Sequence, residues 1–128
     1  MKVCHYTDVR PSDENYAPGV ALRCVIGEAD GAPHFAMRVI DVAPGAATQH
    51  HNHWWEHEVF VVSGRGCVIS EEGSRPLGEG TVIYIEGDET HQIVNDGDEV
   101  LRFVCLIPHP RLKGVVEALE SEALPDQC

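Results

Sequence analysis

The chain has 128 residues, enough for one domain with a single sizeable core, and 43% of them are hydrophobic. Its formal net charge of −12 at pH 7 disfavours binding to phosphate backbones and to anionic membrane surfaces, and no basic patch offsets that charge. We therefore predict no nucleic-acid partner and no membrane partner. The polar opening of the chain shows neither a signal peptide nor an apolar span, which predicts a cytoplasmic protein.

Five cysteines are scattered along the chain without a Cys-x-x-Cys pair. An odd and dispersed set indicates reduced thiols rather than a disulfide framework. Cys24, Cys67 and Cys105 each lie in an apolar, strand-like context, so we predict that all three are small core residues.

The expected elements divide one domain into three stretches. Residues 1–19 are polar and broken by prolines, which predicts an N-terminal arm with a short strand near residues 2–6. Residues 20–108 form a barrel, and residues 109–128 form a tail with a short helix near 111–124, where apolar residues recur at helical spacing. The apolar side of that helix is expected to pack on the barrel or across a dimer interface.

Within the barrel, short apolar runs alternate with glycine turns and no helical pattern intervenes. This rhythm is typical of an antiparallel sandwich or barrel, so we predict an all-β fold. The expected strands are 20–27, 35–43, 48–53, 57–62, 66–70, 74–77, 81–85, 91–95 and 100–107.

Three histidines in the segment 45–64 have the spacing of a metal site on β-structure. Residues two apart on a strand share a face, so His51 and His53 can aim both imidazoles at one ion about 2.1 Å from each nitrogen. His50 has the opposite parity and should point away. His57 opens the next strand and is well placed as a third ligand.

A fourth histidine occupies a similar place further along the chain. After a β-branched strand and a Gly/Asp turn, His91 begins the next strand as His57 does. Glu58 competes with His57 for the third position, but the spacing to Gly64 and the strand parity favour His57.

These two segments resemble the two motifs of the cupin superfamily. The first, Gly-x5-His-x-His-x3-(Glu or His)-x6-Gly, is matched by Gly45, His51, His53, His57 and Gly64. The second, Gly-x5-Pro-x-Gly-x2-His-x3-Asn, is matched by Gly80, His91 and Asn95, while Glu86 replaces the usual proline and Asp88 the usual glycine. The chain is thus similar to small single-domain cupins with four histidine ligands, which implies a double-stranded β-helix, or jelly roll, and a metal bound by His51, His53, His57 and His91.

Ligand type narrows the choice of metal without fixing it. Imidazole suits zinc, copper, iron and nickel, and manganese remains open. An octahedral ion would keep two positions for water, substrate or dioxygen, whereas a closed tetrahedral ion would be structural.

Four further residues are possible pocket residues. Gln49 shares the expected strand face of His51, and Phe103 and Cys105 share a parity on the last strand that we predict to face inward. Arg38 can bind a substrate carboxylate, although an ordinary surface arginine fits its sequence context as well. Trp54 and Trp55 can wall the mouth of the pocket or pack under a loop. No side chain is identified as catalytic.

The resemblance to cupins implies a metal-dependent enzyme that acts on a small organic molecule, with a dioxygenase-like oxidoreductase as the leading interpretation. The alternatives are a non-catalytic module that binds or senses a small ligand, and a lyase or isomerase that uses the ion as a Lewis acid. Exposed sheet edges and the polar arm predict a homodimer.

Overall fold

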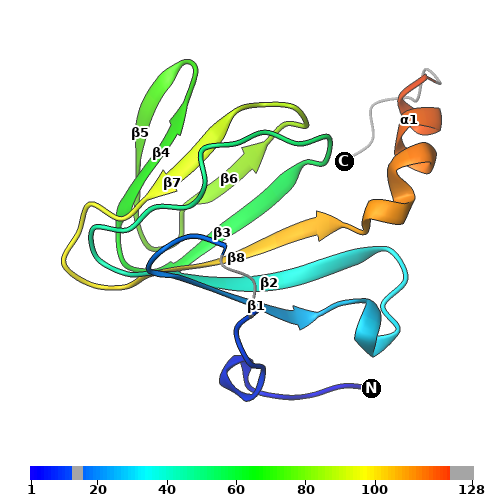
Figure 1. Ribbon diagram of the computed structural model, residues 1–128, viewed down its shortest axis with the longest axis horizontal. Coiled ribbons are helices and arrows are strands. Elements are labelled where there is room, and N and C mark those ends of the chain that lie inside the picture. The colour runs from blue at the N-terminus through cyan, green and yellow to red at the C-terminus, as the bar shows by residue number, and fades with distance from the viewer. Residues whose placement is uncertain (13–15, 122–128) are drawn as a thin grey trace.

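The computed structural model describes residues 1–12 and 16–121, and within them two antiparallel sheets face each other (Figure 1). The larger sheet has the order β1-β2-β8-β3-β6 and the smaller has the order β5-β4-β7. The strands are β1 (Val20–Ile26), β2 (Phe35–Val42), β3 (His57–Ser63), β4 (Gly66–Ser70), β5 (Gly73–Leu77), β6 (Val82–Ile85), β7 (His91–Val94) and β8 (Leu101–Pro108). The short helices are η1 (Tyr6–Asp8), η2 (Glu28–Asp30), η3 (Pro110–Leu112) and α1 (Lys113–Ser121).

The core lies between the two sheets and follows the alternation of the strands. In β3, Val59 and Val61 are buried while Glu58 and Phe60 face outward. The central cluster adds residues from both sheets, namely Ile40, Val42, Leu77, Ile93, Leu101, Phe103 and Cys105. The predicted all-β class is confirmed, and the arrangement is a jelly roll followed by a short C-terminal helix.

One predicted strand is absent, and it lies at the centre of the histidine motif. Residues 48–53 form no ladder, although isolated bridges join Ala47 to Val94 and His51 to His91. Between the bridges, the Thr48 amide donates to the Ile93 carbonyl at 2.9 Å, and the Thr48 hydroxyl accepts from the Ile93 amide at 2.9 Å. A ladder needs consecutive backbone pairing to a neighbour, and a side chain supplies part of the pairing here. The segment nevertheless lies beside β7 and extends the smaller sheet.

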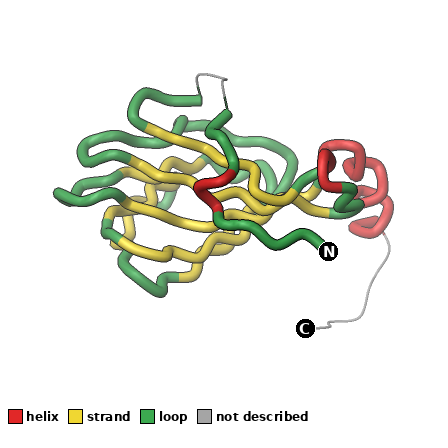
Figure 2. The backbone as a smooth tube through the Cα atoms, turned by 90° about the horizontal axis from the view of Figure 1, so that it is seen from below, coloured by secondary structure: helices red, strands yellow, loops and turns green. Residues whose placement is uncertain are grey.

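The N-terminal arm also differs from the prediction, because residues 2–6 form no strand. The His5 side chain instead caps η1, accepting a hydrogen bond from the Thr7 amide through Nδ1 at 3.3 Å. Beyond this cap, the Tyr6 ring packs against Arg23 of β1 and Arg102 of β8, with its centroid 5.7 and 4.9 Å from their guanidinium carbons. Figure 2 shows the arm crossing beneath these strands, so it covers part of the outer face of the larger sheet.

Two other expectations need correction or restriction. Cys24 is exposed rather than buried, because β1 is an edge strand with no neighbour on its outer side; Cys105 is buried as predicted, and Cys67 is half-buried. The predicted helix begins as η3 and α1, and its continuation beyond residue 121 lies outside the described residues. None of the described helices combines the length and the apolar composition needed to cross a membrane.

Asn95 ties the end of β7 to two other parts of the barrel. It has no exposed surface, and its Nδ2 donates to the carbonyls of Val42 at 2.9 Å and Glu99 at 2.7 Å. Its Oδ1 accepts from the Gly97 amide at 2.9 Å. The side chain therefore satisfies three buried or partly buried backbone groups at once.

We expect Asn95→Ala to destabilise the protein by about 3 kcal/mol, because it removes partners of backbone groups that water cannot easily reach. Urea unfolding followed by circular dichroism measures this loss. Asn52→Ala is the matched control, since Asn52 is exposed and makes one bond to Thr90. Equal stability of the two variants would contradict the assigned role of Asn95.

Candidate metal centre

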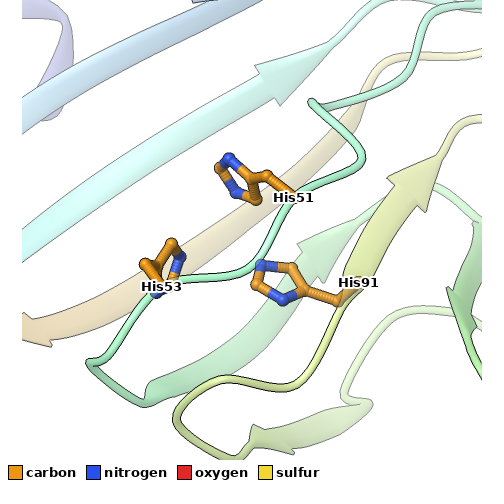
Figure 3. Close-up of side chains that lie close together, drawn as sticks. All are labelled: His51, His53 and His91. Atoms are coloured by element: carbon orange, nitrogen blue, oxygen red, sulfur yellow. The ribbon is translucent and has the colours of Figure 1, made fainter.

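Three histidines from two distant segments meet at one end of the barrel. His51 and His53 come from the segment before β3, and His91 opens β7; Figure 3 shows their rings turned toward a common space. One nitrogen from each ring lies within 4.8 Å of the others. The bridge between His51 and His91 brings the two segments together, with reciprocal backbone hydrogen bonds of 3.2 and 3.0 Å.

Backbone carbonyls orient two of these rings. His53 Nδ1 lies 3.0 Å from the carbonyl oxygen of Trp55, and His91 Nδ1 lies 2.8 Å from that of Glu89. A carbonyl only accepts, so each Nδ1 carries the proton and donates it. Each Nε2 is then left with a lone pair, which is the form of imidazole that binds a metal.

His57 joins this group from β3. Its Nε2 lies 2.7 Å from His53 Nε2, and its ring centroid lies 4.5 Å from that of His53 and 4.9 Å from that of His91. Two nitrogens bound at right angles to one ion at about 2.1 Å are roughly 3 Å apart, so this separation fits neighbouring ligands. Glu58 points to the outer face and is exposed, so it does not reach this space.

The turn before β7 holds His53 in place. The Asp88 amide donates to the His53 carbonyl at 2.6 Å, and Asp88 has a φ of 65°. Short polar side chains tolerate this left-handed conformation, which explains how aspartate replaces the usual glycine. A Cβ at Gly87 would collide with the Trp54 carbonyl, so this position needs glycine.

Trp55 covers one side of the cluster. Its ring stacks on His53 with centroids 3.7 Å apart and planes 6° from parallel. The stacking restricts rotation of the His53 ring, which its bond to the Trp55 carbonyl already limits. The indole Nε1 is buried and donates to no described group.

A cavity adjoins the histidines. It is lined by Tyr16, Arg38, Ile40, Thr48, His57, Val59, Ile85, His91, Ile93, Phe103 and Cys105. Arg38 is the one arginine or lysine among these residues, and no carboxylate lines the cavity.

Arg38, Cys105 and His57 form a connected group at the cavity wall. Arg38 Nη2 donates to Cys105 Sγ at 3.3 Å, and His57 Nδ1 lies 3.0 Å from the same sulfur. Arg38 Nη2 also lies 3.4 Å from His57 Nδ1 and can only donate to it, so Nδ1 is an acceptor, and His57 Nε2 carries the proton and donates to His53 Nε2. A metal bound at this nitrogen would replace that proton. Arg38 Nε is buried and has no hydrogen-bond partner among the described residues.

The structure separates the four possible pocket residues. Phe103 and Cys105 face inward, and Arg38 lines the cavity rather than the surface. Gln49 is exposed and donates to the Tyr16 carbonyl at 2.5 Å. It therefore binds the N-terminal arm and does not orient an imidazole. Tyr16 and Thr48 line the cavity but lack a sequence signal, because one lies in the irregular arm and the other in a segment without a ladder.

The buried surroundings favour uncharged side chains beside Arg38. Burial, with the positive charge of Arg38 as a second cause, lowers the pKa of His57 to about 2. Burial likewise lowers the pKa of His53 to about 4 and lowers that of His51. Burial raises the pKa of the Cys105 thiol and that of Tyr16, so both keep their protons at neutral pH.

These lowered histidine pKa values predict acid destabilisation of the metal-free protein. Above pH 6.5 both the folded and the unfolded chain hold neutral histidines, whereas below it the unfolded chain takes up protons that the folded chain cannot. His57 alone should cost about 2 kcal/mol between pH 7 and pH 5. Urea unfolding in the presence of a chelator at both pH values measures the loss. His57→Gln should reduce it, and substitution of the exposed His50 should not.

Solved structures share this architecture. The polyketide cyclase RemF from Streptomyces resistomycificus is 31% identical with a TM-score of 0.77, over 84% of this chain and 79% of that one. A predicted oxalate decarboxylase from Thermotoga maritima is 21% identical with a TM-score of 0.73, over 84% of this chain and 98% of that one, and at this identity it supports the fold alone.

A sequence relative and a family model complete the comparison. Auxin-binding protein 1 of Arabidopsis thaliana is 26% identical over 113 residues, which are 80% of this chain and 57% of that protein. This chain therefore spans little more than half the length of that relative. The family model described as Cupin domain matches residues 38–107, more than half of the chain. With both motifs and the jelly roll in place, the chain belongs to the cupin family.

Proposed function

We propose that His51, His53, His57 and His91 bind one divalent transition metal ion. The observation that carries this proposal is the convergence of four imidazoles, whose neighbouring ring centroids are 4.5 to 5.2 Å apart. The carbonyls of Trp55 and Glu89 support it, because they hold two rings in the tautomer that a metal requires.

The chemistry proposed for this site is a lyase, isomerase or cyclase reaction on a small oxygenated organic molecule. A bound ion would supply Lewis-acid polarisation of a substrate oxygen. The 31% identity to a polyketide cyclase supports this class and moves it ahead of the oxidoreductase favoured on sequence grounds. Fold likeness at lower identity does not distinguish the two classes.

Residues around the cavity would bind and enclose the substrate. The guanidinium of Arg38 offers a fixed positive charge, and the protonated hydroxyl of Tyr16 offers a hydrogen-bond donor. Ile40, Ile93 and Phe103 form an apolar wall that keeps water from the far end of the cavity.

An oxygen-using oxidoreductase is the second function proposed, because a set of imidazoles without a carboxylate also suits iron. A module that binds a small ligand without converting it is the third. These functions differ in measurable ways: oxygen uptake marks the oxidoreductase, and binding without turnover marks the module.

The test begins with protein reconstituted separately with zinc, iron and manganese. We expect about one equivalent of metal per chain by elemental analysis, and at least a tenfold lower affinity for zinc in His53→Ala, because a ligand is lost. His50→Ala is the matched control and should keep full occupancy, since His50 is exposed. Small oxo acids and diketones should be converted by the zinc form without oxygen uptake, as followed by NMR and an oxygen electrode.

Three outcomes would contradict these assignments. Equal metal loss in His50→Ala and His53→Ala would reject the ligand set. Oxygen uptake coupled to turnover with iron or manganese alone would favour the oxidoreductase. Ligand binding without turnover in any metal form would favour the binding module.

A second copy of this chain is the proposed protein partner. The outer face of the larger sheet that the arm leaves uncovered is mainly apolar, with Phe35, Phe60, Val82 and Tyr84 between 52% and 74% exposed and Glu58 opposite Tyr84. With Val62, these side chains expose on the order of 500 Å², near the upper limit for a monomer without a partner. Stacked sheets need two apolar faces, and a two-fold dimer supplies the same face twice.

We expect the protein to sediment as a dimer and Phe60→Glu to sediment as a monomer, because the change removes a large apolar side chain from the face and buries a second carboxylate beside Glu58 without a partner. Val100→Glu makes the same change at an exposed valine in the loop before β8 and should remain dimeric. A monomeric wild type, or a dimeric Phe60→Glu, would reject this interface. Sedimentation velocity at micromolar concentration distinguishes the two states.

A further inference from the structure

Arg38 brings a positive charge to the cavity without a negative partner, and this excess of positive charge indicates the class of ligand. Arg38 lines the cavity, and its described contacts are two neutral groups, the thiol of Cys105 and the imidazole of His57. The ion pairs found in the described part of the chain do not include Arg38. Arg38 is partly buried, and charges withdrawn from water are normally paired, so a cation without a counter-charge indicates a missing anion.

An unused donor on the same side chain indicates the same ligand. Arg38 Nε is shielded from water and donates to no described group. A buried N–H without an acceptor is costly, and such groups are rare in folded proteins. The edge of the guanidinium that carries the Nε and Nη N–H groups matches the two oxygens of a carboxylate, so an oxyanion would satisfy the donor and the charge together.

The proposed metal would enlarge this imbalance. Four neutral imidazoles leave the dipositive charge of the ion uncompensated, and Arg38 adds one more positive charge beside His57. Among the described residues no carboxylate lines the cavity to offset this charge. The compensating charge must then come from the ligand.

The other walls of the cavity limit what that anion can be. Ile40, Val59, Ile85, Ile93 and Phe103 are apolar and offer no hydrogen bond to a fully hydrated anion. A ligand that contacts both Arg38 and these walls carries its charge at one end and an apolar body at the other. Inorganic phosphate lacks that body.

We propose that the ligand of this site is a small organic oxyanion, a carboxylate or an enolate with a short apolar body, which Arg38 and the bound ion hold together. This inference rests on the metal site proposed above and defines the substrate class of that site. Arg38 is then the residue that selects charged over neutral ligands.

Two pairs of probes test the inference and separate the two sources of the anion. The first pair is 2-oxobutyrate and its uncharged methyl ester. The second pair is acetylacetone, which forms an enolate, and 3,3-dimethylpentane-2,4-dione, which cannot. Titration calorimetry with the zinc-loaded protein measures binding directly and does not depend on turnover.

We expect at least one anionic probe to bind at least about tenfold more tightly than its neutral partner, since charge pairing with Arg38 is lost in the neutral molecule. Arg38→Met should weaken that anion by about tenfold or more and leave the neutral probe unchanged. Its melting temperature should be maintained or raised, because an unpaired and partly buried charge is replaced by an apolar side chain of similar length. Arg10→Met removes a positive charge from an exposed position and should bind as the wild type does.

Some results would overturn the inference. One is that neither anion binds, and another is that each anion binds no more tightly than its neutral partner. The inference also fails if Arg10→Met and Arg38→Met lose the same affinity for the anion, or if phosphate binds as tightly as the organic anions. A zinc titration of the same variants separates this failure from failure of the proposed function. If zinc binds both Arg38→Met and the wild type while the affinity for the anion is the same in both, the proposed metal site is supported and the proposed ligand class is wrong. If zinc fails to bind the wild type, the metal site is wrong, and loss of anion affinity in metal-free Arg38→Met would still support the role of Arg38.

Discussion

The reciprocal backbone hydrogen bonds between His51 and His91 are the constraint on which the site depends. They join two segments that are far apart in the chain, and they do so at an isolated bridge rather than within a ladder. Because the pairing stops there, the chain after His51 is free to turn, and His53 reaches the same space from the next part of the segment. The strand β3 then brings His57 to the cluster from the larger sheet. The site is thus assembled where the two sheets meet.

Strand periodicity was sufficient to predict the parts of the site that lie on regular structure. The inward directions of His57, Phe103 and Cys105 follow from alternation along β3 and β8, and all three are buried. The inward direction of Arg38 was predictable by the same rule, since Arg38 shares its parity with the buried Ala36 and Ile40. Arginine is so often a surface residue that the residue type argued against the direction that the parity indicates.

Positions that depend on long-range packing were beyond the reach of local patterns. Gln49 has the parity of His51 but bonds to the arm, because no ladder fixes the direction of that segment. Tyr16 lines the cavity from an irregular stretch that carries no periodic signal. The two departures from the second motif are compensated locally. Asp88 adopts the left-handed conformation, and the Glu86 amide, which a proline would lack, donates to the Glu89 carboxylate at 3.3 Å.

The placement of Trp55 and Cys105 has a consequence for the durability of the protein. The Trp55 indole lies flat against the His53 ring, and the Cys105 thiol lies 3.0 Å from His57 Nδ1, so two side chains that are easily oxidised stand beside the histidine cluster. Any oxidant that escaped there would attack them first and loosen His53 and His57. A reaction without electron transfer would leave Trp55 and Cys105 unoxidised. Such a protein would lose its function by unfolding before it lost it by oxidation of the histidine cluster's neighbours.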